Sequence, residues 1–500
     1  MQPIWNAGSI EARQFPQLTE TVHADVAIIG GGITGLSTAL SLADAGHEVA
    51  LIEAFGVGER NTGRSTGNLY STVSQGLSGI REQWDDATVR DVVESRTRAL
   101  DGIEHTIRRF GIDCQFARRP LYFVTTGDDD DTEQWLDREY EACVAGGLAA
   151  NLTEDVPLPF ATHRALCLEN QAQYNPLSHA RALAQVVSGL GVSVFEHSRV
   201  LEDDAANGVV RTAQGEVRAQ HVVHATHSPN GLRVVQTRMQ TWREPGISAK
   251  LAGAPCPDGI FWVQDGFHSL RSYRHDGSDY LVVVGEKHEP GDGTAESDHN
   301  EQLRAYAHTR FDVSSFEHTW SAQQFASADL LPFIGRMATG GDVYVGTGFA
   351  ADGLVWGVVA AGIISDLIGG RENQWCKRFD PGRIMSADDA NHWLRENAES
   401  AEQFERELNA GELEHLREAV PPGHSGVAAL GEQQFAVRHG KHGELEVMSA
   451  LCPHKKCVVQ WNDAEATWDC PCHGSRFHAD GTALEGPTYS GLPQRASPDG

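Results

Sequence analysis

The stretch DVAIIGGGITGLSTALSLADAGHEVALIE, residues 25–53, decides how the N-terminal part of the chain folds. Its apolar run Val26–Ile29 predicts a buried parallel strand, and the spaced leucines and alanines that follow predict a helix. Between them lies Gly30-x-Gly32-x-x-Gly35. In this spacing the first glycine permits a tight turn, the second lets the backbone approach a pyrophosphate, and the third lets helix and strand pack closely. The phosphates then meet the N–H groups at the start of the helix.

An acidic residue, Glu53, ends the second predicted strand, where a carboxylate can accept hydrogen bonds from a ribose. A structural glycine turn is the alternative, but a strand before the motif, a helix after it and this acid together favour a dinucleotide site. Glu53 also disfavours a 2′-phosphate, and therefore NADP. The residues expected at the cofactor here are Gly30, Gly32, Ile33, Thr34, Gly35 and Glu53.

Two later segments indicate which dinucleotide is bound. Gly63-Arg-Ser-Thr-Gly-Asn68 is a second glycine-punctuated polar loop, and the segment 329–368 contains Asp-Leu-Leu-Pro-Phe-Ile-Gly, Val-Gly-Thr-Gly-Phe and Asp-Gly-Leu motifs before an apolar helix. With these motifs in this order, residues 22–372 resemble the D-amino-acid-oxidase-like (glycine oxidase and sarcosine oxidase type) FAD-dependent oxidoreductases. The resemblance favours FAD over NAD.

The resemblance implies further contacts with FAD. Its residues would be Arg64, Ser65, Thr66, Val200, Ala225, Thr226, Gly348, Asp352, Gly353 and Leu354. In the family the corresponding strand ends in Ala-Thr-Gly. Here His227 replaces the glycine, so the sequence leaves the backbone path at this point open.

A second motif pair lies near the C-terminus. Cys452-Pro-His454 and Cys470-Pro-Cys-His473 each place one thiol and one imidazole close together. A zinc site is the alternative, since two cysteines and two histidines also suit zinc, but zinc fingers usually pair Cys with Cys and His with His. The string Cys-Pro-Cys-His-Gly-Ser and the later Gly486-Pro487 resemble the Rieske family throughout. That resemblance implies a 2Fe–2S cluster with Cys452, His454, Cys470 and His473 as ligands.

Other features follow from the Rieske resemblance. Cys457 and Cys472 match the cysteines that form a disulfide beside the cluster in respiratory members. Ser475 matches a hydroxyl that hydrogen bonds to the cluster, whereas Phe477 stands where those members carry tyrosine. Lys455 and Lys456, at the cluster tip, could be a docking patch for an acidic surface or simply solvated lysines.

Composition excludes several classes of protein. The chain has 500 residues, of which 40% are hydrophobic and 22% charged, as in a soluble globular protein with about two to four domains. A net charge of −29, with only six lysines among forty basic residues, argues against nucleic acid and anionic membranes as partners and is compatible with a high-salt cytoplasm. Residues 1–15 lack the features of a signal peptide, and the apolar stretch 343–368 contains two aspartates. We therefore expect a cytoplasmic protein without a membrane span.

The expected architecture is an α/β Rossmann-like FAD-binding domain interleaved with an α+β substrate domain, followed by a small all-β Rieske domain. The expected oxidoreductase spans 22–372, with FAD-binding parts 22–80, 175–235 and 325–372 and substrate-binding inserts 81–174 and 236–324. A mainly helical connector, 373–422, and a Rieske domain, 423–500, complete the chain. Strands are predicted at 119–125, 247–251, 260–263, 270–273 and 280–284.

The combination of domains resembles the YhfW-like Rieske flavoproteins. It implies oxidation of a small amine or amino acid by hydride transfer to FAD, with electrons relayed through the cluster to an external carrier protein. A redox sensor or maturation factor, and a flavin reductase fed by an external donor, are the alternatives. A Rieske oxygenase is disfavoured, because the sequence lacks an Asp/Glu-x-x-His-x4-His iron motif. Substrate-site candidates are Arg271, Tyr273, Arg274 and His288. An arginine among them could clamp a carboxylate, although a structural role is favoured for each.

Overall fold

The computed structural model describes residues 2–9, 13–127, 130–204, 207–231, 234–253, 255–338, 341–383, 408 and 410–496. The chain forms two compact units. Unit 1 comprises Met1–His227, Glu244–Lys287 and Asn300–Ile384, and unit 2 comprises Ser228–Arg243, His288–His299 and Met385–Gly500. Each unit is described by itself.

The first sheet of unit 1 is mainly parallel and contains the strand predicted before the glycine motif. Its order is β16-β17-β10-β1-β2-β7, and the hairpin β8–β9 is attached to β10. The bounds are β1 Thr21–Ile29, β2 Val49–Ile52, β7 Ser193–Phe195, β8 Glu202–Asp204, β9 Val209–Arg211, β10 Glu216–His224, β16 Phe333–Arg336 and β17 Asp342–Thr347. β17, β10, β1, β2 and β7 are parallel neighbours, so their carboxyl ends lie at one edge of the sheet.

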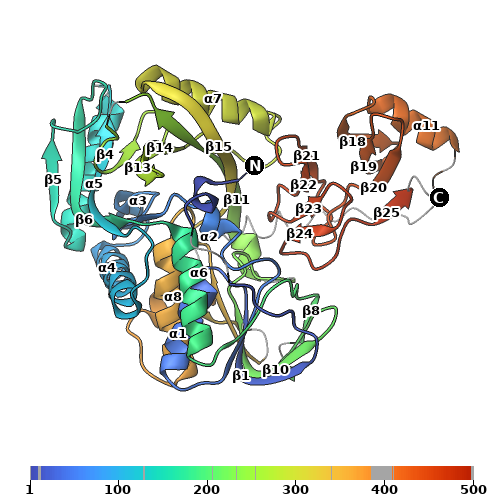
Figure 1. The fold of residues 1–500 in the computed structure, drawn as a ribbon, viewed down its shortest axis with the longest axis horizontal. Helices are drawn as coiled ribbons and strands as arrows, with labels where there is room; N and C mark the ends of the chain where they lie inside the picture. The colour runs from blue at the N-terminus through green and yellow to red at the C-terminus, as the bar shows by residue number, and fades with distance from the viewer. Residues whose placement is uncertain are drawn as a thin grey trace. The chain divides into compact units, whose positions relative to one another are not determined.

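Three helices, α1 (Ile33–Asp44), α6 (Pro176–Gly189) and α8 (Gly353–Ile368), lie side by side in unit 1 (Figure 1). α1 and α8 are apolar around most of their surface, which suits helices buried between other elements. α6 starts at Asn175, whose side chain accepts hydrogen bonds from Leu177 N and Ser178 N, with Pro176 at the first helical position. Full burial of an apolar β1 side chain such as Val26 or Ile28 contributes about 1.5–3 kcal/mol.

The second sheet of unit 1 is mostly antiparallel. Its order is β15-β11-β14-β13-β12-β4-β6-β3, with β5 paired to β6, and only β12 and β4 among the pairs in this list run parallel. The bounds are β3 Asn68–Leu69, β4 Ala117–Thr125, β5 Ala150–Thr153, β6 Arg164–Gln173, β11 Met239–Leu251, β12 Ile260–Val263, β13 His268–His275, β14 Ser278–Val284 and β15 Val313–Ser327. The predicted strands lie within β4, β11, β12, β13 and β14.

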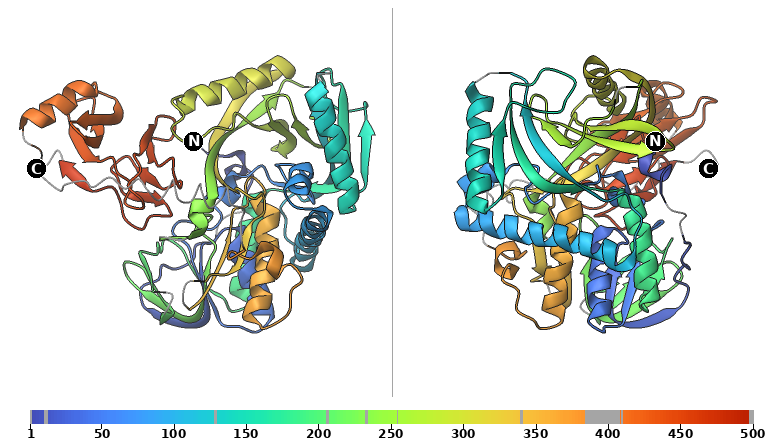
Figure 2. Two further views of the ribbon diagram at one scale, coloured as in Figure 1. Left: turned by 180° about the vertical axis from the view of Figure 1, so that it is seen from behind. Right: turned by 60° about the vertical axis from the view of Figure 1, so that its left-hand side comes forward.

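Helix α7 (Glu296–Arg310) lies along this second sheet (Figure 2). Its Leu303, Tyr306 and Ala307 pack into an apolar cluster with strand residues such as Ile247 and Phe261. The remaining helical segments are η1 Ile4–Asn6, α2 Asn61–Arg64, α3 Leu77–Gln83, α4 Asp86–Phe110, α5 Asp130–Gly146, η3 Val234–Arg238, α9 Cys376–Phe379 and α11 Ala410–Ala419.

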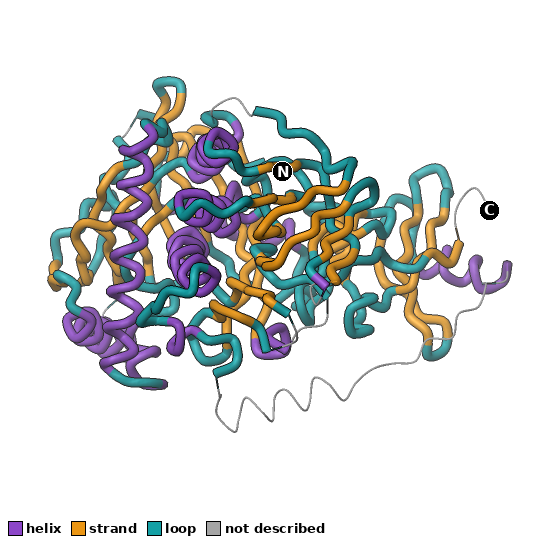
Figure 3. The backbone as a smooth tube through the Cα atoms, turned by 90° about the horizontal axis from the view of Figure 1, so that it is seen from below, coloured by secondary structure: helices purple, strands orange, loops and turns teal. Residues whose placement is uncertain are grey.

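Unit 2 contains short strands joined by long loops (Figure 3). One four-stranded sheet has the order β18-β19-β20-β25, and another has the order β21-β22-β23-β24. The bounds are β18 Ser425–Leu430, β19 Gln433–His439, β20 Leu445–Ser449, β21 Gln460–Asn462, β22 Thr467–Asp469, β23 Arg476–His478, β24 Ala483–Glu485 and β25 Gln494–Ala496. The mixed α/β sheets and the all-β C-terminal part confirm the predicted fold class.

The predicted helical connector, 373–422, is described only in part. α9 and α11 belong to it, whereas 384–407 and 409 lie outside the described residues. The acidic run 128–131 is described only from Asp130, where α5 begins. Within the part of the chain that the structure describes, none of the helices combines the length and the apolar character needed to cross a membrane.

Candidate functional site

The glycine motif forms the turn between β1 and α1 and leaves no room for side chains. A Cβ on Gly30, which has φ +111°, would lie 2.4 Å from the Ala225 carbonyl oxygen, and a Cβ on Gly35 would lie 1.9 Å from the Gly30 carbonyl oxygen. α1 follows Gly32 without a side-chain cap, and the Thr62 hydroxyl accepts a hydrogen bond from Ile33 N. This backbone-lined helix start, followed directly by Thr34, suits the close approach of a pyrophosphate.

The other residues expected at the cofactor lie at the same edge of the parallel sheet. Glu53 follows β2, Ala225 and Thr226 follow β10, and Gly348 follows β17. The buried Glu53 carboxylate accepts hydrogen bonds from Gly31 N at 2.6 Å and Phe55 N at 2.8 Å, and burial raises its pKa. Strand ends of a parallel sheet are where such folds bind nucleotides, so the residues present fit a dinucleotide cofactor. Val200 is also buried.

His227 takes the conformation that glycine would have taken. Its φ is +70°, and its carbonyl oxygen accepts a hydrogen bond from the Thr347 hydroxyl at 2.6 Å. A left-handed conformation costs a residue with a side chain about 1 kcal/mol relative to glycine. The backbone at His227 therefore adopts a conformation that favours glycine although the residue carries a side chain.

The second glycine loop is held by its carbonyl groups. Trp320 Nε1 donates to the Arg64 carbonyl and Trp5 Nε1 to the Ser65 carbonyl, each at 2.8 Å. Arg271 Nη1 donates to the Thr66 carbonyl at 3.0 Å and also to the Tyr174 carbonyl. Three side chains from distant parts of the sequence therefore fix the loop predicted to contact FAD.

Asp352 stands at the start of α8 but faces away from the helix. Its carboxylate makes no capping bond and instead accepts hydrogen bonds from the Ser74 N–H and hydroxyl. The Tyr70 hydroxyl also hydrogen bonds to this carboxylate, and the buried Arg96 lies 3.9 Å away. The first turn of α8, at Gly353 and Leu354, therefore has no side-chain cap from Asp352 and can offer N–H groups to a ligand.

Several polar side chains that were not predicted from the sequence lie near this end of α8. Glu244 on β11 accepts a hydrogen bond from the Gln324 side chain on β15. Burial, followed by the charge of Asp352, raises the pKa of Tyr70 well above its usual value, and Glu244 adds to this shift. Lys287, just beyond β14, has its pKa lowered by burial, while Glu244 and Asp352 oppose that shift. We call Tyr70, Glu244, Lys287 and Gln324 the polar cluster. Its one signal in the sequence was Lys287, in a chain with few lysines.

The four substrate-site candidates do not share a single location. Arg271 is buried and bonded to backbone carbonyls, and burial lowers its pKa to about 9. Tyr273 accepts a hydrogen bond from the Asn175 amide, whereas Arg274 is exposed and pairs with Asp279. His288 belongs to unit 2, where its Nε2 lies 3.1 Å from Glu296. These contacts tie Arg271 to the loop at Thr66 rather than to a substrate.

The paired cysteines and histidines of unit 2 lie in two loops, one between β20 and β21 and one between β22 and β23. Backbone hydrogen bonds from Cys452 N to Cys457 O and from Cys470 N to Ser475 O close the two loops. The rings of His454 and His473 are 5.0 Å apart, and the Cys452 and Cys470 side chains are hydrogen bonded to each other. The two thiols therefore lie together and the two imidazoles lie together, which is the pairing that a two-thiolate, two-imidazole ligand set requires.

The protonation of Cys452 and His454 also suits metal binding, whereas the hydrogen bond between the two thiols raises the pKa of Cys470. The hydrogen bond from Cys470 lowers the pKa of Cys452 to about 7, which favours the thiolate. Burial, with His473 and Lys455 close by, lowers the pKa of His454 to about 3 and keeps its ring neutral. Both forms are those in which a metal is bound.

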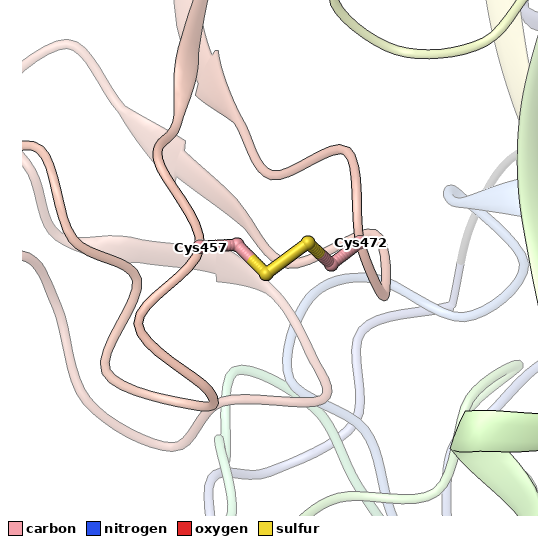
Figure 4. Close-up of a disulfide and its surroundings, with 2 residues drawn as sticks. All are labelled: Cys457 and Cys472. Carbon is pink, nitrogen blue, oxygen red and sulfur yellow. A yellow bond between two sulfur atoms is a disulfide. The ribbon is translucent and has the colours of Figure 1, made fainter. Parts of the chain in front are cut away.

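A disulfide joins the two loops beside this ligand set. Cys457 and Cys472 are bonded, with their Cα atoms 6.4 Å apart (Figure 4). The Cys470 sulfur lies within 4.8 Å of both disulfide sulfurs, which are themselves not available as thiolate ligands. Ser475 and Phe477 are buried in the same loop and strand, and the Ser475 hydroxyl accepts a hydrogen bond from Thr488 N.

Comparisons with known proteins agree with this geometry. Residues 25–367 match the family model described as FAD dependent oxidoreductase, and 414–495 match the Rieske [2Fe-2S] domain. The chain is 30% identical to the Bacillus subtilis protein named "Putative Rieske 2Fe-2S iron-sulfur protein YhfW", over 97% of this chain and 96% of that one. It is 25% identical to gamma-glutamylputrescine oxidoreductase of Escherichia coli, over 73% of this chain and 87% of that one.

Solved structures show the same fold at lower identity. Glycine oxidase from Geobacillus kaustophilus superposes with a TM-score of 0.60 at 18% identity, covering 73% of this chain and 100% of that one. L-proline dehydrogenase from P. horikoshii gives 0.59 at 19% identity, covering 73% and 98%.

The fold and both sites define a flavoprotein oxidoreductase with an iron–sulfur domain. The chain belongs to the FAD dependent oxidoreductase family and carries a C-terminal Rieske domain. Its cofactors are FAD and a Rieske-type 2Fe–2S cluster, which confirms both predicted groups.

Proposed function

We propose that the chain oxidises a small amine or amino acid and passes the electrons to an external acceptor protein. When bound, FAD would accept a hydride from the substrate, and the cluster would carry the electrons onward one at a time. The protein's part is to hold the substrate, position both cofactors and exclude water. The observation that supports the relay is that Gln236, which contacts His454 in a cluster loop of unit 2, lies only ten residues after Thr226 in the chain.

The residues proposed to hold FAD are those gathered at the edge of the parallel sheet, together with the second glycine loop and the start of α8. Cys452, His454, Cys470 and His473 are proposed to hold the cluster. We assign the flavin chemistry to 22–372, joined by 373–422 to a Rieske domain at 423–500.

The polar cluster supports an amine-type substrate. Glu244 offers a carboxylate that can bind an ammonium group, and its bond to Gln324 fixes the orientation of that carboxylate. Lys287, whose pKa is lowered by burial, can bind a substrate carboxylate or exchange a proton. Relatives named for glycine, L-proline and gamma-glutamylputrescine are consistent with this class of substrate.

An anaerobic screen of amines, amino acids and hydroxy acids tests the proposal. One metabolite should bleach the flavin absorbance rapidly, whereas NADH should not. With that metabolite, Glu244→Gln should raise the concentration needed for half-maximal bleaching. Bleaching by NADH alone would instead support a flavin reductase, and no bleaching by any reduced metabolite would support a redox sensor.

A further inference from the structure

Gln236, a residue of η3, contacts a proposed cluster ligand within unit 2. Its side chain is 1% exposed, and Oε1 lies 3.0 Å from His454 Nε2. Its Nε2 donates to the Pro229 carbonyl at 2.5 Å and to the Gly231 carbonyl at 2.8 Å. The segment is itself joined to the Rieske fold, because Gly231 N donates to the Pro487 carbonyl at 2.9 Å.

These bonds settle which atom of the amide faces the histidine. Both N–H groups of the Gln236 amide are directed at carbonyl oxygens, so the amide oxygen must face the imidazole. An oxygen acceptor requires His454 Nε2 to carry the proton. The backbone of Gly231 is a second hydrogen-bond partner of this imidazole. The other ring nitrogen, Nδ1, therefore keeps its lone pair for a metal.

We infer that Gln236 is a positioning residue for the iron–sulfur cluster, holding His454 in the Nδ1-binding tautomer and setting the cluster's reduction potential through the Nε2–H bond. The inference rests on the proposed role of His454 as a ligand. A second partner of this kind fixes the orientation of a histidine ligand and raises its basicity. A more basic imidazole stabilises the oxidised iron, so the bond lowers the reduction potential.

The bond also has a consequence for electron transfer. The imidazole edge that would otherwise be open to a partner is bonded to a segment of the same chain, ten residues after Thr226. The hydrogen bond therefore joins a ligand of the proposed cluster to a segment that follows the proposed FAD contacts Ala225 and Thr226 in the chain. The other histidine, His473, is buried in the cluster loop.

Two substitutions separate the hydrogen bond from a structural role of the amide. Gln236→Met and Gln236→Glu both lose the N–H donors that bond Pro229 and Gly231, but only glutamate keeps an oxygen facing His454. Each variant would be made in the full chain, loaded with cluster and titrated electrochemically while the Rieske EPR signal is recorded. We expect methionine to raise the midpoint potential and glutamate to leave it equal or lower it.

Pulsed EPR of the remote histidine nitrogen gives a second readout on the same samples. The coupling of this nitrogen to the cluster should change in Gln236→Met and should stay as in the parent in Gln236→Glu. Gln240→Met, on an exposed position of the same segment, is the matched control and should leave both readouts unchanged.

If the midpoint potential shifts with the same sign in both variants, Gln236 only supports the structure of the loop, and the inference is wrong. The inference is also wrong if the potential shifts in neither variant. If methionine prevents cluster loading, the glutamate variant alone must show a potential no higher than the parent's. A parent protein with full iron but no Rieske signal would instead refute the ligand assignment on which the inference rests.

Discussion

Arg243 and Glu465 form a buried ion pair in unit 2, although 222 residues separate them. The same carboxylate contacts Arg476, and Glu296 and Asp469 complete the group. All five side chains are at most 8% exposed. The group joins both short segments of unit 2, 228–243 and 288–299, to the Rieske strands β22 and β23. Buried charges of this kind are tolerable only when each is paired.

Removing the charge of Glu465 should therefore destabilise unit 2. Glu465→Gln leaves two buried guanidinium groups with one fewer carboxylate, so we expect a loss of about 3–5 kcal/mol in the free energy of unfolding. Urea unfolding followed by the visible circular dichroism of the cluster measures it. Glu446→Gln removes the partner of Arg438, a pair that is 44% and 22% exposed, and should cost less than about 1 kcal/mol. Equal losses for the two variants would show that the buried group is not a stabilising junction.

The packing of α8 against the start of α1 should depend on one glycine. A Cβ on Gly357 would lie 2.7 Å from Thr34 Oγ1 and 3.1 Å from Ile33 Cγ2, whereas a Cβ on Gly362, in the same helix, meets nothing within 4 Å. Gly357→Ala should therefore cost about 1–3 kcal/mol and loosen FAD, because it displaces the helix start at the proposed pyrophosphate site. Gly362→Ala should stabilise the chain by up to about 1 kcal/mol. Thermal unfolding and FAD release measure both effects, and the prediction fails if the two substitutions behave alike.

The parts of the fold that the sequence revealed are those coded by local pattern. Gly30, Gly32 and Gly35 lie between a continuous apolar run and a segment with a period of 3.6, so the strand, the turn and the helix could all be predicted. The loops of Cys452 and Cys470 were readable because their ligands are close in sequence. Such local signals can be recognised without knowledge of the tertiary structure.

The contacts that could not be predicted join residues far apart in the sequence. Arg271 was a carboxylate-clamp candidate because its strand covers the flavin region, but its partners are carbonyls of loops 205 and 97 residues away. Alternation along a strand does not say which backbone groups lie opposite its buried face. Glu244 gave no signal for the same reason, since its partner Gln324 is on another strand, and Gln236 meets His454 across 218 residues.

The ribose-binding role of Glu53 predicts a defect in cofactor affinity. Glu53→Ala removes a buried carboxylate that also accepts the Gly31 and Phe55 N–H groups, so FAD binding should weaken by about 1.5–3 kcal/mol. That corresponds to a rise in Kd of roughly 10- to 150-fold. Fluorescence titration of the FAD-free protein measures it, with Glu48→Ala, exposed just before β2, as the control. Unchanged FAD affinity in Glu53→Ala would contradict the assignment.

His179 should make unit 1 less stable in mild acid. Burial lowers its pKa from 6.5 to about 4, so above pH 6.5 the histidine is neutral in both folded and unfolded chains. As the pH falls from 6.5 towards 4, the unfolded chain takes up the proton first, and this histidine's contribution to stability is lost. At pH 5 the loss is roughly 2 kcal/mol.

Replacing His179 with leucine should remove that part of the acid sensitivity. Urea unfolding at pH 7 and pH 5, followed by flavin fluorescence at fixed FAD concentration, should show a smaller difference between the two pH values in the variant than in the parent. His105→Leu, at an exposed position, should keep the parent's difference. A difference as large in His179→Leu as in the parent would mean that another group dominates.

The electron route can be tested by removing one proposed cluster ligand. Cys470→Ser should abolish the Rieske EPR signal while FAD stays bound, because the FAD residues belong to unit 1 and Cys470 to unit 2. Substrate oxidation precedes the cluster in the proposed order, so the substituted protein should still bleach its flavin at the parent's rate. Anaerobic turnover with an external one-electron acceptor should fall. Without the cluster, the two electrons of the reduced flavin have no route by which to leave one at a time. Cys376→Ser, a half-buried cysteine outside the Rieske motifs, is the matched control and should change neither rate. If Cys470→Ser turned over the acceptor as fast as the parent, the Rieske domain would be a sensing or stabilising module instead of a relay.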